Sequence, residues 1–103
     1  MIVNVPSGIP YFSGTKVLDG NTYRFTFRWA ESNGKWYMDL VGISNDISIH
    51  GMAMLCGFDL LRIHGYSELG RLYVIDNLGE DEDPDFDSLG NRHIVEYFPL
   101  DQT

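Results

Sequence analysis

The stretch YRFTFRWAESNGKWYMDLV, residues 23–41, decides the fold of this chain. From Tyr23 to Ala30 aromatic and polar residues alternate, which is the pattern of a strand with one buried face. Asn33 and Gly34 separate this strand from a second one. Both residues tolerate the positive φ that a two-residue type I′ turn requires. The stretch therefore predicts a β-hairpin at the centre of the domain.

A turn at Asn33 and Gly34 also predicts the register of the hairpin, which pairs Ser32 with Lys35, Trp29 with Met38, Phe27 with Leu40, and Phe25 with Gly42. Seven apolar side chains then share one face: Tyr23, Phe25, Phe27, Trp29, Trp36, Met38 and Leu40. Arg28 lies opposite Asp39 on the other face. A slip of one residue would move polar side chains to the buried face. We expect the aromatic stripe to be core and not a sugar-binding platform.

Length and composition restrict the class of protein. The chain of 103 residues is expected to form a single β domain, residues 1–103. Its net charge of −8 argues against nucleic acid or an anionic membrane as a partner. The single cysteine, Cys56, excludes an internal disulfide, and Met1–Asn4 lacks the features of a signal peptide. We expect a protein that is synthesised in a cytoplasm and spans no membrane.

The rest of the chain alternates short apolar runs with turn residues, which predicts an all-β fold. We expect a small antiparallel β-barrel or sandwich of six to eight short strands with one short helical turn. Further strands are expected at 15–18, 47–54, 71–76 and 93–98, with a loop at 65–70 and the helical turn from Asp83 to Gly90. Residues 55–64 fit either a short helix or a buried strand, and a strand with a bulge at Gly57 is preferred because Gly57 and the lack of a cap disfavour a helix.

Two segments outside the strands are distinctive. Residues 1–14 contain Pro6 and Pro10 among apolar residues, which predicts an extended N-terminal arm or edge strand. Residues 77–91 form an acidic loop, because seven acids and no basic residue lie between Asp76 and Asp87. This loop fails the EF-hand pattern for calcium: counted from Asp81, Phe86 occupies the glycine position. We expect a solvated loop that binds no divalent ion tightly.

The remaining reactive side chains give no catalytic pattern. His50, His64 and His93 lack the spacing of metal ligands, and Cys56 lies in an apolar run, as a small buried side chain would. A glycosidase pair of carboxylates is not excluded by spacing, but a β domain of this size has little room for a deep cleft. We expect no enzyme activity and no cofactor.

In its motifs and their order the chain resembles the baseplate plug proteins of contractile-tailed phages, described in a cyanophage. The similarity extends from about residue 3 to 98 and includes an N-terminal Val-Pro arm and the segments 18–25, 28–29, 34–40, 58–61, 72–76, 81–84 and 89–90. The resemblance implies a virion protein without catalytic or metal residues. It implies a structural part of the tail, near the hub and spike, present in several copies.

An assembly protein of this kind needs contact surfaces. A closed ring requires two different faces on each subunit, and we assign one to the arm and one to the acidic loop. The expected interface residues are Ile2, Val3, Val5, Ile9, Tyr11, Phe12, Asp81, Asp83 and Asp85. The expected partners are the hub, the spike and neighbouring plug subunits, so that the protein is a homo-oligomer in the particle. The alternative function is a calcium- or carbohydrate-binding β module.

Overall fold

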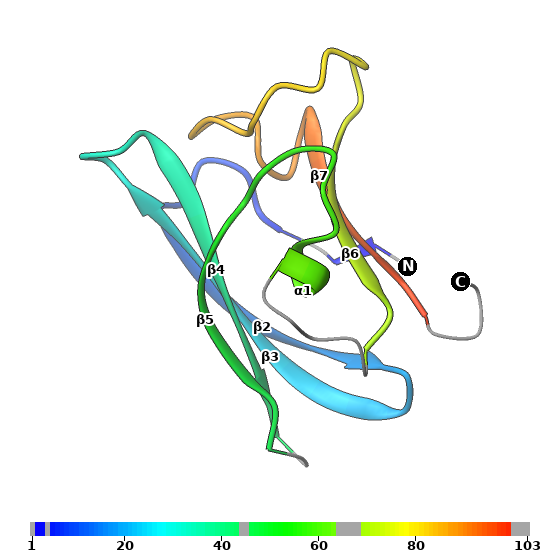
Figure 1. Ribbon diagram of the computed structural model, residues 1–103. Coiled ribbons are helices and arrows are strands. Elements are labelled where there is room, and N and C mark those ends of the chain that lie inside the picture. Colours follow the sequence, from blue (N-terminus) through cyan, green and yellow to red (C-terminus); the bar gives the residue numbers. More distant parts are fainter. Residues whose placement is uncertain (1, 4, 44–45, 64–68, 100–103) are drawn as a thin grey trace.

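Two antiparallel sheets face each other in the computed structural model, which describes residues 2–3, 5–43, 46–63 and 69–99 (Figure 1). The elements are β1 (Ile2–Val3), β2 (Tyr11–Leu18), β3 (Asn21–Ala30), β4 (Lys35–Gly42), β5 (Ser48–Ala53), α1 (Leu60–Ile63), β6 (Arg71–Asp76) and β7 (His93–Phe98). One sheet has the order β1-β7-β6 and the other β2-β3-β4-β5. The predicted all-β fold is confirmed as a sandwich, since the described strands form two sheets and no closed barrel.

The central hairpin of β3 and β4 is present, but its loop has four residues and not two. Ala30 pairs with Lys35, which leaves residues 31–34 as the loop. The amides of Asn33 and Gly34 both donate to the carbonyl of Ala30, at 3.1 and 2.8 Å. Only Gly34 of these two has a positive φ, at 64°. The predicted two-residue type I′ turn is wrong, because it needs positive φ at both central residues.

The register is therefore shifted by two residues from the predicted one, and the observed pairs are Trp29 with Trp36, Phe27 with Met38, Phe25 with Leu40, and Tyr23 with Gly42. A shift of two keeps every side chain on its predicted face. Six of the seven predicted residues are buried, and Trp29 is half-buried against the core. Arg28 pairs with Tyr37 but still reaches Asp39 diagonally, with Nη2 3.2 Å from Oδ1.

The core fills the space between the two sheets. The inward row of β6 and β7 contributes Leu72, Val74, Val95 and Tyr97, each at most 1% exposed. These side chains pack with the aromatic row of β3 and β4 in one cluster. Burying a side chain of this size contributes about 1.5–3 kcal/mol, so this apolar layer holds the sheets together. The aromatic stripe is core, as predicted.

Other local predictions have mixed outcomes. The strands at 71–76 and 93–98 are confirmed as β6 and β7, and the strand at 47–54 as β5. The strand predicted at 15–18 begins four residues earlier, so Tyr11–Leu18 forms an edge strand that includes the end of the expected arm. The loop at 65–70 lies mostly outside the described residues.

The preference for a buried strand with a bulge within 55–64 is wrong. Leu60–Ile63 forms the helix α1, which packs beside β6 (Figure 1). Leu60 and Leu61 are buried, and Gly57 has a φ of 83°, so it turns the chain between the Cys56–Val74 bridge and the helix. Two adjacent leucines fit one short helical turn that covers a sheet edge.

The helical turn predicted from Asp83 to Gly90 is absent. A hydrogen-bonded turn at residues 86–88 stands in its place. The carboxylate of Asp85 caps this turn, because its Oδ1 accepts from the amides of Asp87 and Ser88 at 3.1 and 2.9 Å. Asp85, and not Asp83 before the proline, is therefore the capping residue.

Candidate assembly surfaces

The acidic loop is anchored by a salt bridge at the end of β6. Nε and Nη2 of Arg92 each donate to the carboxylate of Asp76 at 2.8 Å, and Nη2 also reaches Glu80 at 3.1 Å and Glu82 at 2.9 Å. The Asp76 side chain is fully buried and accepts the Leu78 amide at 2.9 Å. Hydrogen bonds from Arg92 hold the pKa of Asp76 well below its usual range. One arginine thus compensates three carboxylates.

A buried histidine fastens the loop to β7. His93 is 1% exposed, and its Nδ1 and Nε2 lie 2.9 Å from Ser88 Oγ and 2.7 Å from the Glu82 carbonyl. Ser88 Oγ also accepts the amide of Asp85 at 2.8 Å. His93 is therefore a structural residue that links two ends of the loop, in agreement with its lack of metal-ligand spacing.

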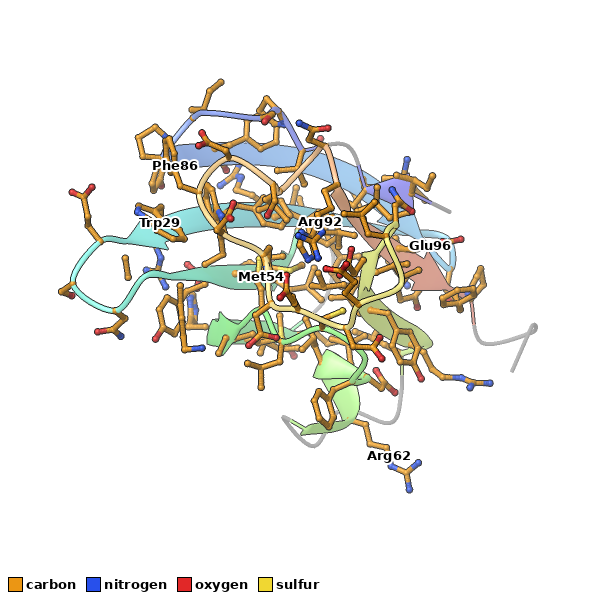
Figure 2. The ribbon with its side chains drawn as sticks, turned by 90° about the horizontal axis from the view of Figure 1, so that it is seen from above. Trp29, Met54, Arg62, Phe86, Arg92 and Glu96 are labelled. Atoms are coloured by element: carbon orange, nitrogen blue, oxygen red, sulfur yellow. The ribbon has the colours of Figure 1, made fainter. Side chains whose placement is uncertain are left out.

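Aromatic packing fixes the tip of the loop on the other sheet. Phe86 stacks on Trp36 with centroids 6.1 Å apart and an interplanar angle of 2°, and meets Trp29 edge-on at 5.7 Å. Figure 2 shows Phe86 of the loop beside Trp29 of β3. The indole nitrogen of Trp36 donates to the Asp85 carbonyl at 2.8 Å. The loop therefore bridges the two sheets at one end of the sandwich.

Two of the three predicted interface acids have structural roles. Asp83 accepts the Cys56 amide at 2.8 Å through Oδ1, and its Oδ2 lies 3.7 Å from Lys35 Nζ. Asp85 caps the turn at 86–88. Asp81 is exposed and has a positive φ of 54°. Among the described residues, no three His, Cys, Asp or Glu side chains come together as a metal ion would require.

The N-terminal segment divides into buried and exposed residues. Val3 is 5% exposed and belongs to the core, and Val5 and Phe12 pack partly against it. Ile2, Ile9 and Tyr11 are exposed at 48%, 43% and 61%. Three of the six predicted apolar interface residues thus present open surface. The other three hold the segment against the sandwich.

The segment and the acidic loop lie side by side. Ser7 Oγ donates to the carbonyl of Asp87 at 3.0 Å. A Cβ placed on Gly90 would lie only 2.1 Å from the carbonyl oxygen of Val5, so the close approach requires glycine there. The two predicted faces therefore join into one surface at one end of the sandwich, which we call the end surface (residues 5–11 and 77–91).

A second surface was not predicted from the sequence. The outer face of the β1-β7-β6 sheet carries the charged residues Arg71 and Glu96 among apolar ones. We call its apolar residues the sheet face: Ile2, Tyr73, Ile75, Ile94 and Phe98. Tyr73 meets Phe98 edge-on at 5.8 Å. In β6 and β7 most residues of both the inward and the outward row are apolar, as in strands covered on two faces, and Arg71 and Glu96 interrupt the outward row. The apolar residues of β6 and β7 are the sequence pattern from which this second surface could have been predicted.

The other reactive side chains have ordinary environments. Cys56 is 6% exposed, as expected of a small buried side chain, and burial raises the pKa of its thiol. His50 lies on the polar outer face of β5, with Nε2 2.7 Å from Ser48 Oγ. His64 lies outside the described residues. In the described part of the chain, no helix has the length and apolar character needed to cross a membrane.

Comparison with known proteins gives one family. The family model described as "Cyanophage baseplate Pam3 plug gp18" matches residues 2–100, nearly the whole chain. No curated protein matches the chain.

Proposed function

This chain belongs to the family of the cyanophage baseplate Pam3 plug gp18, and from that premise we propose that it is a structural part of a contractile tail baseplate. Its place is the tail baseplate of the virion. It acts through contacts with other baseplate proteins and catalyses no reaction. The family match over residues 2–100 is the observation that carries this function.

The two surfaces give this role a physical basis. A small monomer seldom leaves several large apolar side chains together on one sheet face, and such a patch is typical of a contact site. The sheet face and the end surface adjoin at a hollow lined by Ile94, Val5 and Gly90, and a ring subunit needs two contact surfaces of this kind. We propose that copies of the chain meet through these two surfaces around the tail axis, next to the hub and spike.

Each predicted interface residue has a part in this proposal. Ile2, Ile9 and Tyr11 make apolar contacts to a neighbour, and Asp81 faces a basic surface on it. Val3, Val5, Phe12, Asp83 and Asp85 contribute by shape, because they hold the segment and the loop in place. Backbone order of the end surface before assembly lowers the entropy cost of docking.

Cryo-electron microscopy of tails tests this function. Particles from a phage that lacks the gene would be compared with particles complemented by the wild-type chain. We expect density that fits the β-sandwich in the complemented baseplates and a gap at the same place without the gene. If the chain is missing from purified complemented particles, the proposed function is wrong.

A further inference from the structure

Among the described strands, β2 has a neighbour on one side only, so half of its backbone hydrogen-bonding groups face an open edge. The Trp29 amide donates to the Pro10 carbonyl at 2.9 Å, and bonded and non-bonded pairs alternate along an antiparallel ladder. Every second residue from Phe12 therefore bonds to β3. The residues between them direct their amides and carbonyls to the open edge: Tyr11, Ser13, Thr15 and Val17. This edge is eight residues long and is the longer of the two edges of its sheet.

Three hollows follow this edge one after another. The first has a volume of about 400 Å³ and is lined by apolar residues that include Val3, Val5 and Phe12. The second, of about 180 Å³, shares Val3 and Phe12 with the first and reaches Phe25 and Phe27. The third, of about 410 Å³, is lined by Thr15, Lys16, Val17 and Thr22. Together they form a groove along the side of the sandwich where β1 and β2 do not pair.

The inward row of β2 explains why this groove is open. Phe12, Gly14, Lys16 and Leu18 form this row. The ring of Phe12 leans over Gly14, where an added Cβ would lie 3.2 Å from Phe12 Cζ, and a hollow remains beside these two residues and next to Phe25 and Phe27. Lys16 lines two of the hollows, and within the described residues its ammonium takes part in no ion pair. The groove thus offers an apolar site and, two residues further along the strand, a positive charge.

We propose that β2 binds an extended segment of a different baseplate protein, which adds a strand to the sheet. Backbone bonds to Tyr11, Ser13, Thr15 and Val17 give the affinity, and alternate side chains of the segment enter the groove. An apolar side chain enters the hollow beside Phe12 and Gly14, and an Asp or Glu two positions away pairs with Lys16. This proposal rests on the proposed function, because it names one partner within the same assembly.

Charge complementarity selects a different protein over a second copy of this chain. The strand β2, with the sequence YFSGTKVL, has no carboxylate, so pairing two copies through β2 leaves Lys16 without an anion. The edge strands β1 and β5 also lack acids. The edge strand β6 has only Asp76, which is buried on Arg92. None of the open edges among the described strands can supply the acid that Lys16 requires.

Zero-length crosslinking of purified tails tests the proposal directly. A carbodiimide joins an amine to a carboxylate that is in contact with it, and mass spectrometry then identifies both peptides. We expect Lys16 crosslinked to an Asp or Glu that lies two residues from an apolar residue in another baseplate protein. The Lys16→Arg variant keeps the charge but cannot form the amide, so its tails should assemble normally and lose this crosslink.

A backbone test complements the crosslink. The variant Ser13→Pro removes an amide that points to the open edge and leaves the ladder to β3 intact, since Phe12 already has the extended conformation that precedes proline. The matched control Ser13→Ala keeps the amide, and both variants lose the Ser13–Thr26 hydroxyl contact at 3.3 Å. We expect Ser13→Pro to enter tails at least about tenfold less than Ser13→Ala, with melting temperatures within a few degrees of each other.

The outcomes separate this inference from the proposed function. If the chain is in the tail but Lys16 crosslinks only to another copy of this chain, or to nothing, the inference is wrong and the structural role stands. Equal incorporation of Ser13→Pro and Ser13→Ala likewise overturns strand addition. If Ser13→Pro fails to fold, strand addition at β2 is tested by the Lys16 crosslink in wild-type tails alone. Absence of the wild-type chain from the tail contradicts the proposed function itself.

Discussion

The outer faces of the two sheets differ in chemistry. The four-stranded sheet presents a polar outer row on its central strands: Arg24, Thr26 and Arg28 on β3 with Asp39 on β4. Asp39 bonds to Arg28 at 3.2 Å and to the Gly51 amide at 2.8 Å, so this face satisfies its own polar groups. The three-stranded sheet presents the apolar sheet face instead. Each sheet nevertheless buries its inner row in the same core.

This difference indicates which of the two outer faces gains stability from contact with another protein. A polar face with internal hydrogen bonds is complete in water, whereas an apolar face gains free energy when another surface covers it, at roughly 25 cal/mol per Å² buried. The three-stranded sheet therefore has apolar residues on both faces, but only its inner face is packed against another described layer. In the baseplate we assign the cover of its outer face to a neighbouring protein.

The largest expected effect separates the inner and outer rows of one strand. On β6, Leu72→Ala should lower the free energy of unfolding by about 2–5 kcal/mol, because it leaves a cavity in the core. The neighbouring Tyr73→Ala should cost about 0.5–1.5 kcal/mol, mainly the edge-on contact with Phe98. Urea denaturation of the isolated chain measures both. If both variants lost the same free energy of unfolding, the outer row of β6 would be part of the core. The contrast between the two rows would then be wrong.

Acid should weaken the loop anchor at the end of β6. The pKa of Asp76 is lowered in the folded state by Arg92, so its contribution to stability is full above its unfolded pKa near 3.8 and is lost as pH falls below that value. Urea midpoints between pH 7 and 2.5 should drop more steeply for the wild type than for Asp76→Asn. Parallel curves for the wild type and Asp76→Asn would contradict this account of the loop anchor.

The hairpin loop of the polar-faced sheet predicts a smaller effect. Gly34 has a φ of 64°, which a β-branched residue resists, so Gly34→Val should cost about 1 kcal/mol or more. Gly34→Asn tolerates this conformation and should cost less. Thermal unfolding of both variants measures the difference. A loss for Asn as large as that for Val would show that the backbone conformation at residue 34 is not the cause.

The smallest effect is expected on the polar face itself. Arg28→Ala removes the bond to Asp39, but the guanidinium is partly exposed at 44%, so stability should change by about 0.5 kcal/mol or less. Incorporation into tails should be unchanged. A marked loss of incorporation with intact stability would show that the polar face is also a contact surface.

Much of the fold could be predicted from the sequence because alternation is a local property. The seven residues of the hairpin's buried face were identified correctly even though the turn was not, since an error of two residues preserves the face. The turn failed because Glu31-Ser32-Asn33-Gly34 also fits a four-residue loop, and the pair Asn33-Gly34 alone does not distinguish the two.

The surfaces were harder to predict because they depend on contacts between distant residues. The sequence shows the acids of residues 77–91 but not that Arg92 and His93 fold them onto β6 and β7. It shows apolar residues in β6 and β7 but not that no described element covers their outer row. The hollow beside Phe12 and Gly14 appears only when β2 is placed beside Phe25 and Phe27.

The central claim is that the chain joins the baseplate through the apolar sheet face, and one pair of variants tests it most directly. Ile94→Glu places a charge on the sheet face, and Thr26→Glu places the same charge on the polar face. Both would complement a phage that lacks the gene, with quantitative mass spectrometry of purified tails as the readout. We expect both proteins to fold, Thr26→Glu to enter tails like the wild type, and Ile94→Glu to fall to about a tenth or less. Equal incorporation of the two folded variants would contradict the claim.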